Sequence, residues 1–329
     1  MAGEFDLIAN YFNWLDTSDN VQLGVGDDAA VLAITPNHEL VISVDTLVSG
    51  VHYPLDTSPA DIGYKSLIVN LSDIAAMGAV PKWFTLALTL PEYDENWLEG
   101  FSSGLKQAAT EYGVALIGGD TTRGATTISI QIMGEVVAGE ALKRSAAMSG
   151  DDLYISNTLG DAAAGLLIHQ ENQALSQVSR ASNAPLKKLS DAEAYCISRL
   201  NRPTARVAES RVICQYATAC MDISDGLLQD LSHLLKASQL GAIIDTANMA
   251  VSKQLASLYS RREVLKFAFS GGDDYELLFS VPKHHQVHFA AAMQKNNMSF
   301  QRIGELTNSG DEIRDEQGNL LSAGGFKHF

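Results

Sequence analysis

Residues 58–80 (SPADIGYKSLIVNLSDIAAMGAV) constrain the fold most, because they predict a helix that is apolar around most of its circumference. Pro59 suits a first helical turn and Ser58 can cap it, while Gly78 and Pro81 mark its end. A helix that is apolar nearly all round must be buried on nearly all sides. The chain therefore needs other layers of structure around this segment.

Three polar side chains interrupt this apolar helix. Ser66, Asn70 and Asp73 are spaced four and three residues apart, which places them within ~60° of arc at about 100° per residue. A polar stripe on a buried helix faces either a functional site or a satisfied hydrogen-bond network. We favour the functional site.

The remaining segments predict two α/β domains. In the first half, strands are expected at 40–44, 83–90, 114–117 and 126–137, with a helix at 94–112 and a hairpin at 21–34. A turn, a strand and a helix at 149–170 restart the pattern, so we expect domains at 1–147 and 148–329. Helices entered by Pro203 and at 227–238, and a strand after residue 274, belong to the second domain.

Five short segments rich in glycine and aspartate lie at predicted strand ends or helix starts. They are residues 26–28, 43–46, 118–124, 222–226 and 271–274. Taken singly, each can be an ordinary turn or cap; Asp27–Asp28 can be a solvated hairpin tip, and Asp225 can cap a helix. If they converge with Asp73, they predict several Mg²⁺ ions held by oxygen ligands.

Charge and motif content exclude several classes of function. The net charge is −16, from 23 Lys+Arg and 39 Asp+Glu, which disfavours nucleic acid and anionic membranes as partners. Neither a GxxxxGK[ST] loop nor GxGxxG occurs, and the three cysteines lack the spacing of a zinc site. The start lacks the pattern of a signal peptide and no apolar run is long enough to span a bilayer, so we expect a cytoplasmic protein.

Three further residues have two readings each. His52 is either an ordinary loop histidine or a ligand contact, and Arg144 either forms a surface salt bridge or binds phosphate. Phe326, in the ending GGFKHF, either packs or closes over a ligand.

The ordered motifs resemble those of the thiamine-monophosphate kinases, in the superfamily of aminoimidazole ribonucleotide synthetase. The resemblance runs nearly end to end and rests on GEF, VGDDAAVL, SVDTLVSGVHY, NLSDIAAMGA with Pro81, LTLP, LIGGDTTRG, KRS, DISDGL and SGGDDYEL. It implies a two-domain fold of class α/β (α+β), each domain a mixed sheet packed with helices. The implied N-terminal domain binds ATP and magnesium and dimerises, and the C-terminal domain completes the active site. The implied reaction transfers the γ-phosphate of ATP to thiamine monophosphate in line, giving thiamine diphosphate.

The resemblance also implies roles for individual residues. The implied magnesium ligands are Asp28, Ser43, Val44 through its backbone, Asp45, Asp73, Asp120, Asp222 and Asp225. The implied ATP contacts are Gly119, Asp120, Arg144 and Ser224, and the implied substrate contacts are His52, Asp273 and Phe326. Asp45, Asp120 and Asp225 are expected to be catalytic. The tail departs from the pattern, because Ala323 and Gly324 stand where relatives can carry bulkier residues.

Three alternatives stay open. An aminoimidazole ribonucleotide synthetase would activate an amide oxygen, but SGGDDYEL and DTLVSGVHY favour the thiamine reading. A selenophosphate synthetase is expected to carry Cys or selenocysteine near its start, and this chain has no cysteine before Cys196. A non-catalytic cation- or nucleotide-binding module would lack turnover with ATP.

Overall fold

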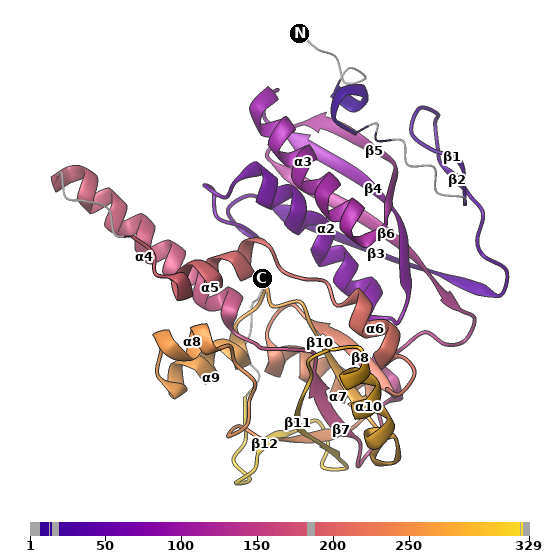
Figure 1. Ribbon diagram of the computed structural model, residues 1–329, viewed down its shortest axis with the longest axis vertical. Helices are drawn as coiled ribbons and strands as arrows, with labels where there is room; N and C mark the ends of the chain where they lie inside the picture. Colours follow the sequence, from indigo (N-terminus) through magenta and orange to yellow (C-terminus); the bar gives the residue numbers. More distant parts are fainter. Residues whose placement is uncertain (1–6, 13, 15–19, 183–187, 323, 325–329) are drawn as a thin grey trace. The chain divides into compact units, whose positions relative to one another are not determined.

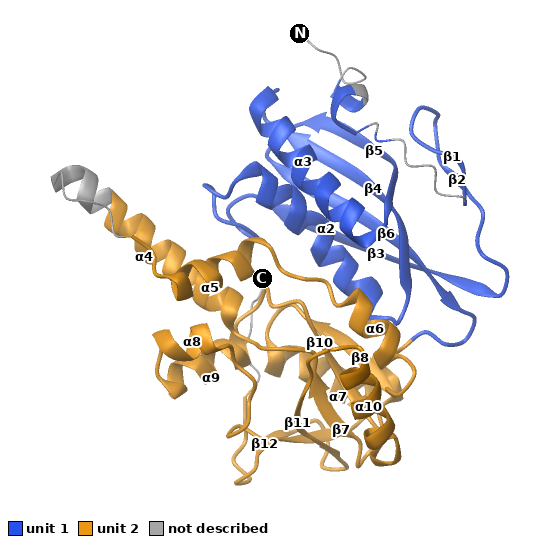
Figure 2. Ribbon diagram, viewed as in Figure 1, with its two compact units in different colours: residues 1–141 blue, residues 142–329 orange. Residues whose placement is uncertain are grey.

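The computed structural model describes residues 7–12, 14, 20–182, 188–322 and 324 (Figure 1). The chain divides into two compact units, unit 1 at residues 1–141 and unit 2 at residues 142–329 (Figure 2). Each contains a mixed sheet packed with helices, as the predicted fold class requires. None of the helices among the described residues is long and apolar enough to cross a membrane.

Unit 1 is built on a four-stranded sheet in the order β3-β6-β4-β5. Its elements are the π-helical turn η1 (Ile8–Phe12), β1 (Val21–Leu23), β2 (Val31–Leu32), β3 (His38–Val48), α2 (Pro59–Ala76), β4 (Val80–Leu90), α3 (Glu95–Tyr112), β5 (Ala115–Arg123) and β6 (Thr127–Val137). Neighbouring strands are antiparallel except β4 and β5, which are parallel. Strands β1 and β2 form the expected hairpin.

Helices α2 and α3 pack side by side on one face of this sheet (Figure 1). Their axes come close because Gly63 and Gly104 lack side chains: a Cβ at Gly63 would collide with the carbonyl oxygen of Phe101, and one at Gly104 with that of Ala60. The same sheet face supplies alternate buried residues such as Leu88. These layers bury helix α2, as the sequence predicted.

Helix α2 begins as predicted and ends slightly earlier. The Ser58 hydroxyl accepts the N–H of Asp61 at 3.1 Å, and Pro59 opens the first turn. The helix is capped by Met77 and followed by Gly78 at φ 70°. Pro81, which we had expected to end the helix, instead lies within β4, where the pairing with β6 is irregular. Pro81 pairs with Gly134 directly before the register shifts, and an irregularity of this kind is where a strand accepts a proline.

The prediction of a turn at residues 118–124 was wrong over most of its length. Gly118, Gly119, Asp120, Thr121, Thr122 and Arg123 all continue strand β5 and pair in parallel with β4. The chain leaves the strand only at Gly124, whose N–H donates to the carbonyl of Leu90 at 2.9 Å. Pairing with β4 outweighs the local preference of two glycines for a turn.

Unit 2 contains a six-stranded sheet in the order β12-β9-β11-β7-β10-β8. Its elements are η2 (Arg144–Ala146), β7 (Asp152–Ile155), α4 (Asp161–Ser182), α5 (Asp191–Asn201), α6 (Val207–Ile213), β8 (Ala219–Ile223), α7 (Leu227–Ser238), β9 (Gly241–Ile244), α8 (Lys253–Leu258), α9 (Arg261–Ser270), β10 (Glu276–Val281), η3 (Lys283–His285), α10 (Gln286–Lys295), β11 (Gln301–Thr307) and β12 (Ile313–Asp315). All neighbours are antiparallel except β12 and β9. Pro203 lies before α6 rather than in its first turn, contrary to our expectation.

Two buried clusters hold unit 2 together on opposite faces of its sheet. Leu278 of β10 belongs to an apolar core with the leucine stripe of α7, including Leu231 and Leu234. Its neighbour Phe279 stacks on Tyr154 and meets Phe289 of α10. Successive strand residues point to opposite faces, so the sheet lies between α7 and α10.

Candidate functional site

Strand β3 and helix α2 bring together part of the predicted magnesium set. The Ser43 hydroxyl donates a hydrogen bond to a carboxylate oxygen of Asp73. The N–H of Asp45 donates to Oδ1 of Asn70 at 3.1 Å. Two members of the predicted polar stripe, Asn70 and Asp73, therefore face β3. The third, Ser66, donates to the carbonyl of Ile62 within its own helix at 2.6 Å.

The electrostatics of this cluster favour a cation. Burial, together with the negative charge of Asp73, raises the pKa of Asp45 to about 7. A cation beside the two carboxylates would offset their mutual repulsion. Within the described part of the chain, no group of three or more His, Cys, Asp or Glu side chains could hold a metal ion. Magnesium is commonly held by one or two carboxylates together with substrate phosphates and water, and a pair of carboxylates with a nearby hydroxyl fits that requirement.

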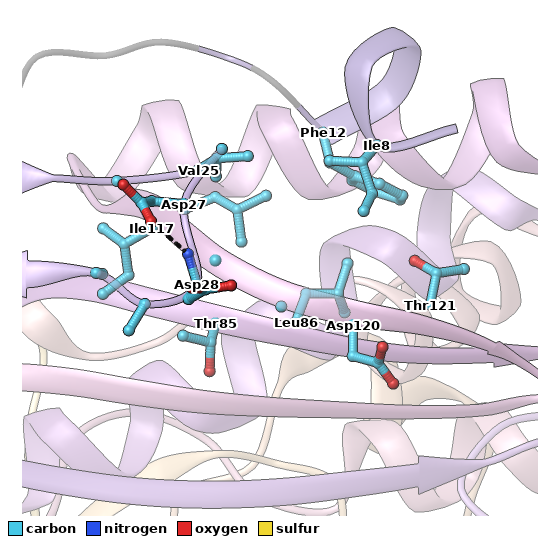
Figure 3. A pocket seen from close by; sticks show the side chains of 17 residues that line it. Ile8, Phe12, Val25, Asp27, Asp28, Thr85, Leu86, Ile117, Asp120 and Thr121 are labelled. Atoms are coloured by element: carbon cyan, nitrogen blue, oxygen red, sulfur yellow. Dashed lines mark hydrogen bonds between the residues drawn. The ribbon is translucent and has the colours of Figure 1, made fainter. Parts of the chain in front are cut away.

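A second acidic region of unit 1 is a pocket beside β5 (Figure 3). The cavity measures about 730 Å³, within the range typical of small-ligand sites. It is lined by residues 24–30 and 116–121, together with Ile8, Phe12, Thr85 and Leu86. Asp28 and Asp120 both lie on it, so the structure brings these two predicted residues to one cavity.

Gly119 lines this pocket, and packing explains why the residue is a glycine. A Cβ at this position would collide with the carbonyl oxygen of Leu86 in the paired strand β4, whereas a Cβ at Gly118 would meet nothing within 4 Å. Only glycine therefore fits at 119 without moving the backbone. This packing requirement is independent of any contact with a nucleotide.

The strand order separates the two acidic regions of unit 1. Asp45 lies on β3 and Asp120 on β5, the two edge strands, with β6 and β4 between them. Three strand spacings amount to about 14 Å. The register pairs Asp45 across the sheet with Gly119 rather than with Asp120, so the two carboxylates also point to opposite faces. Within one chain, a single ion cannot bind both.

His52 follows β3 and closes a tight turn. Its Nδ1 accepts the N–H of Val48 at 2.9 Å, so in the neutral ring the proton is on Nε2. Its carbonyl oxygen accepts a bond from Nζ of Lys65 at 3.3 Å. Lys65 is only 2% exposed, and it is not among the predicted site residues. A lysine within the apolar run of a buried helix was the signal that could have identified it.

In unit 2, two predicted loops lie against each other. The N–H of Asp273 donates to the carbonyl of Ser224 at 2.8 Å, and the N–H of Tyr275 donates to that of Ile223 at 2.9 Å. Asp273 and Tyr275 have φ of 69° and 51°, a conformation that residues other than glycine seldom adopt. The Tyr275 hydroxyl donates to Asp273 at 3.0 Å. Strained backbone of this kind concentrates at functional sites.

The loop that joins β8 to α7 carries three of the predicted residues. Asp222 is buried at the end of β8, and Ser224 and Asp225 follow it. Asp225 does not cap the helix, because Gly226 occupies that position. Instead, its carboxylate accepts a bond from Nε2 of Gln229 at 2.9 Å.

Asp230, which is not among the predicted site residues, holds this loop. One oxygen of its carboxylate accepts the backbone N–H groups of Ser224, Asp225 and Gly226, at 3.1, 3.0 and 3.2 Å. Burial raises the pKa of Asp230 to about 7, and these three bonds act in the opposite direction. The available signal was an aspartate four residues after a glycine, Gly226, which has no side chain to accept N–H groups at the start of the helix.

The last two predicted residues have little structural context. Arg144 is exposed in η2, where its carbonyl oxygen accepts a bond from the Ser238 hydroxyl at 2.7 Å. Its contact with phosphate stays a prediction. Phe326 lies outside the described residues.

The chain resembles known proteins over nearly its full length. Residues 26–136 match the family "AIR synthase related protein, N-terminal domain", and residues 148–316 match the corresponding C-terminal domain. Thiamine-monophosphate kinase from Escherichia coli is 44% identical over 332 residues, covering 100% of this chain and 98% of that protein. The Bacillus subtilis protein of that name is 31% identical, covering 99% of both.

Solved structures extend the likeness to three dimensions. Thiamine-monophosphate kinase from Stenotrophomonas maltophilia has a TM-score of 0.83 at 39% identity and covers 93% of each chain. AaThiL complexed with AMPPCP and TMP has a TM-score of 0.77 at 31% identity, covering 93% of this chain and 92% of that one.

Proposed function

Because this chain belongs to the thiamine-monophosphate kinase family, within the AIR synthase related proteins, we propose that it transfers the γ-phosphate of ATP to thiamine monophosphate. The products are ADP and thiamine diphosphate. The observation that carries this proposal is the full-length likeness to proteins named thiamine-monophosphate kinase, together with the likeness to AaThiL, which was solved with AMPPCP and TMP.

We assign the residues of unit 1 to two acidic regions. Asp28 and Asp120 lie on the pocket beside β5, which is large enough for a nucleotide and has apolar walls at Phe12 and Ile117. The proposed magnesium ligands on β3 and α2 are Ser43, the backbone of Val44, Asp45 and Asp73. Mg²⁺ at these positions would offset the negative charge of polyphosphate oxygens. Gly119 is the proposed backbone contact to ATP.

We assign the remaining roles to unit 2 and to His52. Asp222 and Asp225 are further proposed metal ligands, and Ser224 and Arg144 are the proposed ATP contacts. His52, Asp273 and Phe326 are the proposed contacts to thiamine monophosphate. The close packing of the Ser224 and Asp273 loops supports a shared role, because a shift of one loop would move the other.

The chemistry requires alignment and charge compensation rather than a strong base. The acceptor is a phosphate oxygen that is already anionic at neutral pH, so no residue needs to remove a proton from it. The task of Asp45, Asp120 and Asp225 is then to place the charge-neutralising groups, and that of Arg144 is to orient phosphate oxygens. An acidic chain without a P-loop lysine is consistent with this division of roles.

We propose that two copies of the chain form a homodimer through the sheet of unit 1. On edge strand β3, Leu40, Ile42 and Val44 are 40%, 52% and 61% exposed, on the sheet face opposite α2. An exposed apolar row on an edge strand is costly for a monomer and typical of an interface. Light scattering should give twice the 35.3 kDa of one chain; a monomeric mass at assay concentration would contradict the proposal.

The reaction is tested by ³¹P NMR of the protein with ATP, Mg²⁺ and thiamine monophosphate. We expect ADP and thiamine diphosphate to appear in equal amounts. If ATP stays intact, or is consumed without a new diphosphate ester, the proposed substrate is wrong.

The residue assignment is tested by Asp45→Asn and Asp120→Asn. Each should remove most turnover, on the order of 100-fold or more, because each takes away a charged oxygen at a different acidic region. Exposed Asp311→Asn is the matched control and should keep wild-type activity. Full activity in either purified and folded site variant would contradict the metal assignment.

A further inference from the structure

Helix α7 has no side-chain N-cap. Its N-cap is Gly226, which has no side chain to accept the free N–H groups of the first turn. The residue that faces this region is Asp230, in the first turn of the same helix. Asp230 is only 3% exposed, so its carboxylate is buried.

The Asp230 carboxylate turns back along the helix and binds the loop that precedes it. Its Oδ2 accepts three consecutive backbone N–H groups, those of Ser224, Asp225 and Gly226, all within 3.2 Å. The ionised form of the carboxylate accepts these N–H groups more strongly than a neutral oxygen would. Three of them on one atom fix the course of the backbone over the whole loop.

We propose that Asp230 is a positioning residue for phosphoryl transfer, which holds the Ser224 and Asp225 side chains in the geometry the reaction needs. This inference rests on the proposed function. Asp230 touches the backbone and not the side-chain oxygens of these residues, so it acts through them rather than on substrate.

Two further hydrogen bonds connect the loop held by Asp230 to neighbouring residues. The carbonyl of Ser224 accepts the N–H of Asp273 at 2.8 Å, which ties the second loop to the first. One helical position before Asp230, Gln229 donates to the Asp225 carboxylate at 2.9 Å. The first turn of α7 therefore fixes the backbone of Asp225 through Asp230 and the direction of its carboxylate through Gln229.

The test compares Asp230→Ala, Asp230→Asn and Leu231→Ala in the full-length protein. Asp230→Ala leaves three N–H groups without their acceptor, whereas Asp230→Asn keeps one acceptor oxygen. Leu231 is fully buried in the apolar core of the same helix, so its truncation destabilises unit 2 without touching the loop. Turnover is measured below the melting temperature of all variants, with amide hydrogen exchange of residues 224–226 as the second readout.

We expect Asp230→Ala to lower kcat about 100-fold, the scale of loss for reacting groups displaced by about 1 Å, with smaller changes in KM. The kcat of Asp230→Asn should be at least about tenfold higher than that of Asp230→Ala. The kcat of Leu231→Ala should stay within about threefold of wild type. Amides 224–226 should exchange faster in Asp230→Ala than in Leu231→Ala.

Two outcomes would overturn the inference: equal kcat in Asp230→Ala and Leu231→Ala, or unchanged exchange of the loop amides. Failure of the proposed function is a separate result, because wild-type protein would then produce no thiamine diphosphate. The exchange experiment would in that case still decide whether Asp230 holds the loop.

Discussion

Replacement of Glu276 by glutamine should destabilise unit 2 strongly. Glu276 opens β10 directly after the strained Asp273–Tyr275 segment, and it is completely buried. Its carboxylate accepts bonds from Arg199 at 3.1 Å and from Nη2 and Nε of Arg206, both at 2.6 Å. Glutamine keeps the volume of the side chain but removes the charge that both largely buried guanidinium groups share. Arg206 then retains its ion pair with Glu209, at 3.0 Å.

The magnitude follows from this burial. The Arg199 and Arg206 side chains are 12% and 11% exposed, so water can compensate little of the lost charge. Breaking a buried ion pair by removing one partner costs about 3–5 kcal/mol. For a unit of this size, that corresponds to a melting temperature lower by about 6–20 °C.

The assay is thermal unfolding followed by circular dichroism and by tryptophan fluorescence. Trp14, Trp83 and Trp97 are the three tryptophans of the chain and all lie in unit 1, so their fluorescence reports unit 1 while circular dichroism reports both units. We expect the melting temperature of unit 2 to fall. This change should appear in circular dichroism and not in tryptophan fluorescence.

Glu312→Gln is the matched control, because Glu312 pairs with Arg314 at 2.7 Å while both side chains are more than 40% exposed. It should cost under about 1 kcal/mol. Equal melting temperatures for Glu276→Gln and Glu312→Gln would refute the reasoning.

Two further substitutions test single features of the structure. Burial raises the pKa of Asp274 well above its usual range. Above about pH 4 the unfolded chain releases this proton, whereas the folded protein keeps it. The free energy of unfolding therefore falls as pH rises from about 4 toward the pKa of the folded state. Asp274→Asn should therefore gain melting temperature relative to wild type as pH rises from 5 to 8 in thermal shift assays, and a constant difference would contradict this. Gly119→Ala should destabilise unit 1 by roughly 1–3 kcal/mol through its collision with Leu86, while Gly118→Ala should not; equal urea midpoints for the two would show that Gly119 is not required by packing.

Local sequence patterns determined most of the helices and strands. The spacing of apolar residues identified α2, and its cap at Ser58 was confirmed because capping involves only neighbours along the chain. The ordered motifs also identified the family and its two-domain fold, which the comparisons confirmed. These inferences need no knowledge of which segments meet in space.

Only the tertiary structure decided how the acidic residues are grouped. The sequence left open whether the segments around Asp45 and Asp120 converge, and the strand order places these two residues at opposite edges of one sheet. Strand order depends on pairings between distant segments, which no local pattern specifies. The same holds for residues 118–123, where pairing with β4 overrode the turn preference of two glycines.

The role of Asp230 depends on both the sequence and the tertiary structure. Its position after Gly226 was visible in the sequence, but the direction of its carboxylate was not. A side chain in the first turn of a helix can point to solvent or back to the preceding loop, and burial of α7 against the sheet of unit 2 decides between them. The sequence thus determined which elements form and which family they belong to, while long-range packing determined which polar groups meet.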